Sequence, residues 1–118
     1  MFMKVLRWFP LIPRLVKMYE RPSLAKLMVW HSENRSTDGT MRLVVDSPAH
    51  HHIETTYPMF AQDPRNVRLG LASDGISPFG TMRSKYSCWP VVLMNYNIPP
   101  WMALQKGHIM LSLVLPGN

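Results

Sequence analysis

Hydrophobic and polar positions alternate along the second half of the chain, in three segments that are each typical of a β-strand. The segments cover residues 67–72, 89–96 and 108 to about 115. Alternation with a period of two places successive side chains on opposite faces of a strand. The connections between these segments are too short to hold a crossover helix. The pattern therefore predicts an antiparallel meander, in which each strand pairs with the next.

The first half of the chain shows helical spacing, interrupted by prolines. Pro13 can open a short helix that ends near position 22, where the next proline stands. Ser23 has the place of an N-cap for a second helix, which apolar residues at intervals of three and four extend to about position 34. Residues 37–40 have the composition of a turn. Ser47, followed by a proline, predicts a third helix that reaches about position 57.

These elements predict an α+β fold in two parts. Residues 1–62 form a short helical lead-in, and residues 63–118 form a three-stranded antiparallel meander. A chain of 118 residues with 47% hydrophobic residues has enough apolar material for one modest core. The helices are the only cover available for the faces of the sheet. Because the predicted sheet stops after three strands, we expect the third strand to have an open edge. An open apolar edge favours self-association.

The charge of the chain points to a polyanionic partner. Thirteen Lys and Arg residues against seven Asp and Glu give a net charge of +6. Such an excess favours nucleic acid through neutralisation of phosphates, although a basic protein can also be merely soluble. Cys88 is the single cysteine, which excludes an intrachain disulfide. The apolar runs are far shorter than the ~20 residues that cross a bilayer, so we expect an intracellular protein without a membrane span.

Asp74 is the candidate for carboxylate chemistry. It follows the first predicted strand directly, precedes Gly75, and is the last acidic residue of the chain. A carboxylate at the end of a strand is a suitable ligand for a hard cation such as Mg²⁺. An Asp-Gly pair is also a common turn, and the residues alone leave both interpretations open. Four basic residues near Asp74 are candidates for contacts with DNA phosphates, with solvated surface side chains as the alternative: Arg65, Arg68, Arg83 and Lys85.

Aromatic residues and histidines suggest further sites that we rank lower. The aromatic side chains of Trp30, Trp89, Trp101, Tyr86 and Tyr96 can stack on bases, but their apolar neighbours favour packing in the core. We expect Cys88 to be a buried small hydrophobic residue. The tract of three histidines at positions 50–52 lacks the convergent ligands of a zinc site.

Several blocks of sequence, in a fixed order over nearly the whole chain, are similar to a known family. The blocks are LRWFPLIPRL at positions 6–15, Trp30-His31, DPRNVRLGLASDG at 63–75, SPFG at 77–80, Tyr86-Ser87 with WPVVL at 89–93, YNIPPWM at 96–102, and MLSL at 110–113 with Pro116-Gly117. On these blocks the chain resembles the amino-terminal part of the catalytic region of plant CACTA (En/Spm-type) DNA transposases. Two departures are LVVDS at positions 43–47, in place of a His-Pro-Ala-Asp-Ser type segment, and His50 in place of a bulky aromatic residue.

The resemblance implies a ribonuclease-H-like fold and DNA transposition in the nucleus. An Asp, Asp, Glu triad of the DDE type would hold two Mg²⁺ (or Mn²⁺) ions, with Asp74 as the first ligand. The second Asp and the Glu would lie beyond Asn118. We therefore expect an incomplete catalytic domain that binds no metal stably, cleaves no DNA by itself and binds DNA weakly without sequence preference. The alternative is a non-enzymatic basic module, derived from a transposase, that binds nucleic acid or protein.

Overall fold

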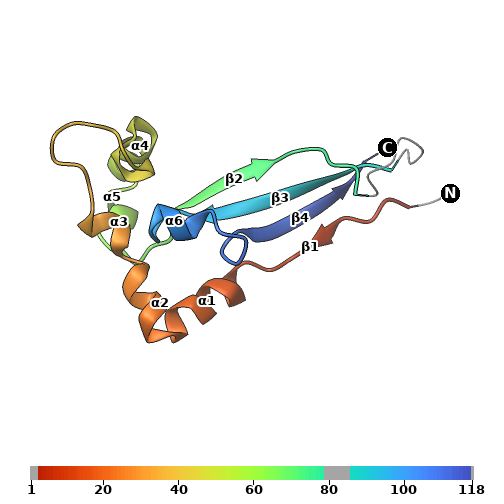
Figure 1. Cartoon of the computed structure of the whole chain (residues 1–118), viewed down its shortest axis with the longest axis horizontal. Helices are drawn as coiled ribbons and strands as arrows, with labels where there is room; N and C mark the ends of the chain where they lie inside the picture. Colours follow the sequence, from red (N-terminus) through yellow and green to blue (C-terminus); the bar gives the residue numbers. More distant parts are fainter. Residues whose placement is uncertain (1–2, 79–85, 118) are drawn as a thin grey trace.

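The structure is a computed structural model, and it describes residues 3–78 and 86–117. Its sheet has four antiparallel strands: β1 (Arg7–Trp8), β2 (Leu69–Ser73), β3 (Cys88–Asn95) and β4 (Met110–Pro116). They lie in the order β1-β4-β3-β2 (Figure 1). The predicted meander of three strands, each paired with the next along the chain, is confirmed as β2-β3-β4. The α+β fold class is confirmed with it.

β1 corrects two expectations about the sheet. Arg7 pairs with Val114 and Trp8 with Leu113, and the Phe9 amide donates to the carbonyl of Ser112 over 2.8 Å. The lead-in is therefore not purely helical, and β1 covers the middle of the β4 edge that was expected to be open along its whole length. A strand of two residues has no periodic pattern, which is why the sequence did not reveal it. The edge strands of this sheet are β1 and β2.

The helices are short, and most begin at a proline. They are α1 (Ile12–Glu20), α2 (Pro22–Leu27), α3 (Trp30–Glu33), α4 (Pro48–Thr56), α5 (Pro58–Ala61) and α6 (Pro100–Ala103), with a 3₁₀ turn η1 (Val44–Asp46). The first and third predicted helices are confirmed as α1 and α4. The sequence did not predict α5 and α6, because four residues are too few to show helical spacing. Among the described residues, no helix is long and apolar enough to cross a membrane.

The second predicted helix is wrong in two respects. It begins at Pro22 with Arg21 as its N-cap, so Ser23 caps nothing, and it is divided into α2 and α3. The division has a tertiary cause. The Asn97 side chain donates to the carbonyl of Met28 over 2.9 Å, and the His31 amide donates to the backbone carbonyl of Asn97 over 3.1 Å. These two tertiary hydrogen bonds take the place of intrahelical backbone hydrogen bonds at the turn between α2 and α3.

Ser47 is the one predicted N-cap that the structure confirms: its hydroxyl oxygen accepts from the His50 amide over 3.2 Å. We expect Ser47→Ala to lower the free energy of unfolding by about 1 kcal/mol, because an amide of the first turn of α4 loses its partner. Ser23→Ala is the matched control and should change stability by a few tenths of a kcal/mol at most. Urea unfolding followed by circular dichroism measures both. Equal losses in the free energy of unfolding for Ser47→Ala and Ser23→Ala would contradict the assignment of Ser47 as the N-cap of α4.

The core lies where the helices meet one end of the sheet. Met28, Ile98 and Ala103 are its most buried apolar residues, with at most 2% of each exposed. Asn95 and Asn97 are completely buried beside them. In Figure 1 the helices gather around this end, while the strands extend away toward the two termini. The helices therefore cover only part of the sheet.

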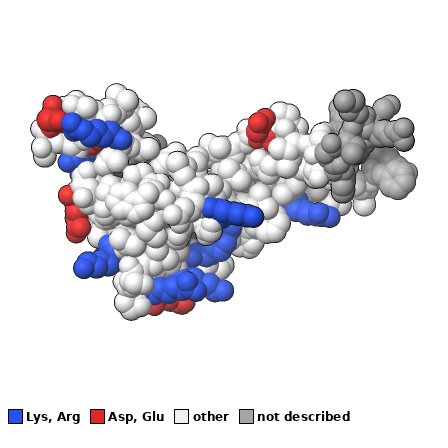
Figure 2. Space-filling view, in the orientation of Figure 1, with Lys and Arg blue, Asp and Glu red and all other residues white. Residues whose placement is uncertain are grey.

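The far part of the sheet exposes an apolar face. Register places Trp8, Leu71, Trp89 and Leu115 on the same face, and they are 67%, 70%, 47% and 40% exposed. The accessible surface of 8886 Å² exceeds the ~6,600 Å² expected for a compact protein of this mass. The radius of gyration of 17.4 Å likewise exceeds the expected ~13.5 Å. Charged side chains are sparse over the sheet in the view of Figure 2.

Candidate functional site

Asp74 lies directly after β2, and it is exposed. Its Oδ1 accepts a hydrogen bond from the Gly75 amide over 2.8 Å. Gly75 lets the Trp89 indole pack closely, because a Cβ at position 75 would lie 3.0 Å from Trp89 Cζ2. Asp74 thus lies between β2 and the antiparallel bridge of Ile76 with Cys88, at the carboxyl end of the first strand of the meander, which is the place that the strand pattern predicted.

The described residues do not assemble a group of three metal ligands around Asp74. Among them, no group of three or more His, Cys, Asp or Glu side chains is arranged to hold a metal ion. A pair of divalent cations needs several carboxylate oxygens, and Asp74 supplies one carboxylate. In the part of the chain that the structure describes, Asp74 is therefore one possible ligand of the two-metal centre that the resemblance implies, and the ligand group of that centre is not assembled.

Two of the four basic candidates, Arg65 and Arg68, lie in the described residues, and they do not form one surface. The Arg65 side chain is 73% exposed, and its guanidinium lies 2.7 Å from the Asp63 carboxylate. The hydrogen bonds from Arg65 lower the pKa of Asp63 to about 2, so this pair is charged at neutral pH. Arg83 and Lys85 lie outside the described residues. Arg65 is accessible to a phosphate, and its contact with DNA stays a prediction.

Arg68 corrects an expectation, because its side chain is buried. Only 6% of it is exposed, and one Nη donates to the Asn66 carbonyl over 2.7 Å. The guanidinium lies over the ring of Phe60, 5.0 Å from its centroid, and within 3.7 Å of Glu54 Oε1. Arg68 precedes β2, where the alternating pattern gave no sign that an arginine faces inward. It does not belong to an exposed DNA-binding surface with Arg65.

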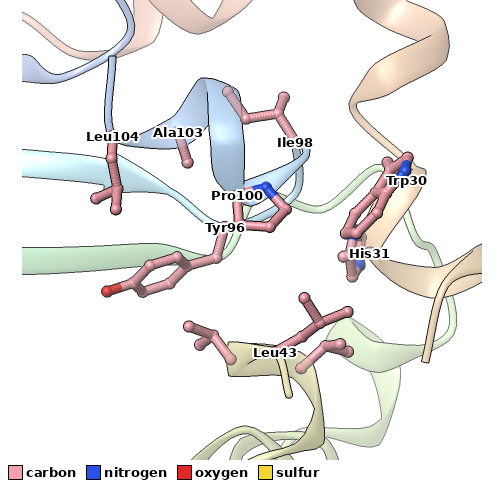
Figure 3. A pocket seen from close by; sticks show the side chains of 10 residues that line it. Trp30, His31, Leu43, Tyr96, Ile98, Pro100, Ala103 and Leu104 are labelled. Atoms are coloured by element: carbon pink, nitrogen blue, oxygen red, sulfur yellow. The ribbon is translucent and has the colours of Figure 1, made fainter. Parts of the chain in front are cut away.

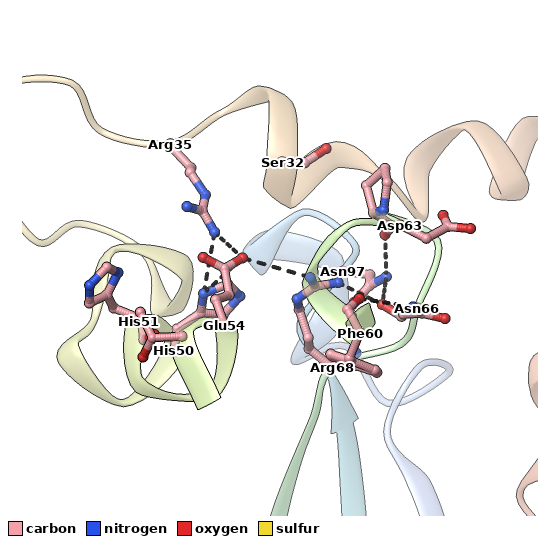
Figure 4. A network of polar contacts seen from close by, with 12 residues as sticks. Ser32, Arg35, His50, His51, Glu54, Phe60, Asp63, Asn66, Arg68 and Asn97 are labelled. Carbon is pink, nitrogen blue, oxygen red and sulfur yellow. Dashed lines mark hydrogen bonds and ion pairs between the residues drawn. The ribbon is translucent and has the colours of Figure 1, made fainter. Parts of the chain in front are cut away.

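The sequence missed a cluster of charged and polar groups around Glu54, and we call it the Glu54 cluster: Arg35, His50, Glu54 and Arg68, with His31 beside them. Glu54 Oε1 lies 2.5 Å from an Nη of Arg35 and 3.7 Å from His50 Nδ1. Figure 4 shows the side chains of Arg35, His50 and Arg68 converging on Glu54. The i, i+4 spacing of His50 and Glu54 in α4 was the one signal in the sequence.

Burial and charge hold the histidines of the cluster neutral. Burial, followed by the positive charge of Arg68, lowers the pKa of His31 to about 4. Burial also lowers the pKa of His50, and the charge of Glu54 opposes this shift only in part. Burial alone would raise the pKa of Glu54, but the hydrogen bond and charge of Arg35 outweigh it and lower that pKa. At pH 7 the cluster holds two cations, one anion and two neutral imidazoles.

A separate apolar pocket of about 230 Å³ lies between α3, η1 and α6. Trp30, Leu43, Ile98 and Leu104 contribute to its walls, and Tyr96 and His31 are polar side chains in its lining (Figure 3). It offers no nucleophile and no carboxylate. The side chains that line this pocket suit the binding of an apolar group and do not suit catalysis.

The aromatic residues are less buried than the sequence predicted. Trp101 is 64% exposed and meets Trp30 edge to face, with ring centroids 5.3 Å apart. Trp89 is 47% exposed. The expectation that both pack in the core is therefore wrong, because the far part of the sheet and α6 lack cover. Cys88, with 7% exposed, is buried as predicted.

Comparison with known proteins identifies the family. The family model described as "Transposase family tnp2" matches residues 38–118. That match covers more than half of the chain and includes Asp74, Glu54 and the whole β2-β3-β4 meander. No curated protein and no solved structure matches the chain. The chain therefore belongs to the transposase family tnp2.

Proposed function

We propose that the chain is the opening part of a CACTA-type transposase catalytic domain, with a ribonuclease-H-like fold and a DDE mechanism in the complete enzyme. Asp74 would be the first metal-binding carboxylate. The main support for this proposal is the position of Asp74 in a chain that belongs to a transposase family. Asp74 lies directly after β2, at the start of an antiparallel meander. Its exposure leaves the carboxylate accessible to ligands.

We propose further that these 118 residues bind DNA in the nucleus but do not cleave it by themselves. Mg²⁺ or Mn²⁺ would need carboxylates in addition to Asp74, and the described residues form no group of three or more metal ligands. DNA binding is supported by the family and by the net charge of +6. Contacts between arginines such as Arg65 and phosphates carry no base information, so we expect weak binding without sequence preference.

A nicking assay tests the catalytic part of this proposal. Purified chain, incubated with supercoiled plasmid and Mg²⁺ or Mn²⁺, should give no more open circles than buffer alone, because one carboxylate does not hold a metal pair. Asp74→Ala is the matched variant and should behave identically. Cleavage by the original chain that disappears in Asp74→Ala would contradict the proposal and would show that the metal site is assembled without further polypeptide.

A non-enzymatic role in protein interaction is the second candidate, and the exposed apolar face of the sheet favours it. Trp8, Leu71, Trp89 and Leu115 form that face, and exposed apolar surfaces of this kind mark contacts with other polypeptides. Under this alternative the chain would self-associate or bind a protein partner through the sheet, while its affinity for DNA would be incidental to its role.

A further inference from the structure

The positive charge of the chain is unevenly distributed along the sequence. Residues 1–26 contain six Lys and Arg and a single acidic residue, Glu20. Residues 27–74 contain four arginines and six Asp and Glu. Those four arginines each have a carboxylate oxygen within 3.7 Å: Arg35, Arg42, Arg65 and Arg68. Most of the net positive charge therefore belongs to residues 1–26, the segment that contains α1.

Part of this charge lines a groove of about 280 Å³, which we call the α1 groove. Arg14, Lys17 and Arg21 line it on the side of α1, and His108 lines it on the side of the loop before β4. Its apolar lining residues are Met18, Leu24 and Met110. Among the described residues, no Asp or Glu lines this groove. Figure 2 shows Lys and Arg side chains gathered over the part of the molecule where Figure 1 places α1 and α2.

The three cations of the α1 groove are not neutralised by carboxylates in the part of the chain that the structure describes. Arg14, Lys17 and Arg21 form no ion pair there, in contrast to the four arginines of residues 27–74. Lys17 and Arg21 are exposed. A polyanion can therefore reach these charges without displacing an acidic side chain, and adjacent cations of one sign attract it.

The backbone holds the Arg14 side chain in place. Its Nε donates to the carbonyl of Pro10 over 2.9 Å, and one Nη donates to the carbonyl of Phe9 over 3.0 Å. A guanidinium has five N–H donors, so three remain for a ligand. Because the side chain is already ordered, an oxyanion binds it with a smaller loss of conformational entropy than it would bind a mobile arginine.

We propose that the α1 groove binds the phosphate backbone of one DNA strand through Arg14, Lys17 and Arg21. Residues three and four positions apart lie on one side of a helix, so these cations form a row about 10 Å long at ~1.5 Å per residue. A strand of duplex DNA carries a phosphate every ~3.4 Å of its axis, so the row suits a repeating polyanion better than a single small anion. The choice of DNA rests on the proposed function.

Titration of a DNA duplex at several salt concentrations tests the groove. The double variant Lys17→Gln/Arg21→Gln should bind about tenfold or more weakly, and its salt slope should flatten by about two units, one for each lost phosphate contact. Lys26→Gln/Arg42→Gln is the matched control, because it removes the same charge from two exposed residues outside the groove. It should leave the slope nearly unchanged.

Further variants and a second probe separate the possible outcomes. Lys17→Arg/Arg21→Lys keeps both charges and should keep the salt slope, and circular dichroism verifies that each variant is folded. Equal losses in Lys17→Gln/Arg21→Gln and in the control would overturn the groove but leave DNA binding by the chain intact. A lack of DNA binding by the original chain would refute the proposed function, and the groove as a DNA site with it. Binding to vesicles of phosphatidylserine and phosphatidylcholine, with none to the duplex, would show a membrane surface in place of DNA.

Discussion

Asn97→Ala should destabilise the chain by about 3–5 kcal/mol, because it leaves several buried backbone groups without partners that each cost about 1–3 kcal/mol. Asn97 is completely buried. Its Nδ2 group donates to the carbonyls of Met28 and Pro64 over 2.9 and 3.2 Å, and its Oδ1 accepts from the Arg68 amide over 2.8 Å. One side chain thus connects the turn between α2 and α3, the loop before β2, and the end of β3.

The loss is a large fraction of the ~5–15 kcal/mol that stabilises an ordinary domain, so the unfolded fraction of Asn97→Ala at 37 °C should be far above that of the original chain. Urea unfolding followed by circular dichroism measures the difference. Asn34→Ala is the matched control: its Nδ2 donates to the Trp30 carbonyl over 2.9 Å at an exposed position, and its loss should cost less than ~1 kcal/mol. Asn97→Asp keeps the acceptor but replaces the donor with a carboxylate that faces carbonyl oxygens, so it should be at least as unstable as Asn97→Ala. A stable Asn97→Asp variant would contradict this role.

Acid should destabilise the chain before its carboxylates titrate, because His31 is buried and neutral. Its pKa is lowered from 6.5 to about 4 in the folded chain, so between these values the unfolded chain binds more protons. Stability therefore falls as the pH falls, and the contribution of His31 between pH 7 and pH 5 is about 2 kcal/mol. His50, whose pKa is lowered as well, acts in the same direction.

The measurement is urea unfolding at pH 7 and pH 5, and the readout is the difference between the two free energies of unfolding. His31→Gln should reduce this difference by about half or more, whatever its own effect on stability, because the group that binds the proton is gone. His52→Gln is the matched control, since His52 is an exposed residue of α4, and it should leave the difference unchanged. A chain whose stability is the same at both pH values would show that His31 is not held neutral by burial.

Regular elements were predictable from the sequence because their signals are local. The alternating residues of β2, β3 and β4 and the cap at Ser47 act over a few positions, and each specified its element. β1 was not predictable, since its two residues gain their strand conformation from pairing with Val114 and Leu113. The break between α2 and α3 depends on Asn97, which lies 69 positions beyond Met28 in the chain.

The candidate site likewise has one part with a local sequence signal and another part that depends on tertiary packing. The place of Asp74 at the end of a strand follows from local pattern and was predicted. The burial of Arg68 was not, because it depends on Glu54 and Phe60, which reach it through the packing of α4 and α5. The Glu54 cluster joins Arg35 after α3, His50 and Glu54 in α4, and Arg68 before β2, so the i, i+4 spacing within α4 was its one signal in the sequence.

DNA binding as a function of salt tests the central claim most directly. Two unrelated duplexes of equal length are titrated with the chain at salt concentrations from about 50 to 200 mM, a range over which phosphate contacts lose much of their affinity. We predict equal affinity for the two duplexes, a steep fall with salt, and a slope that Arg65→Ala flattens by about one unit through the loss of one phosphate contact. Affinity that survives high salt, or that strongly prefers one duplex, would contradict a transposase-derived chain that binds DNA through its phosphates alone.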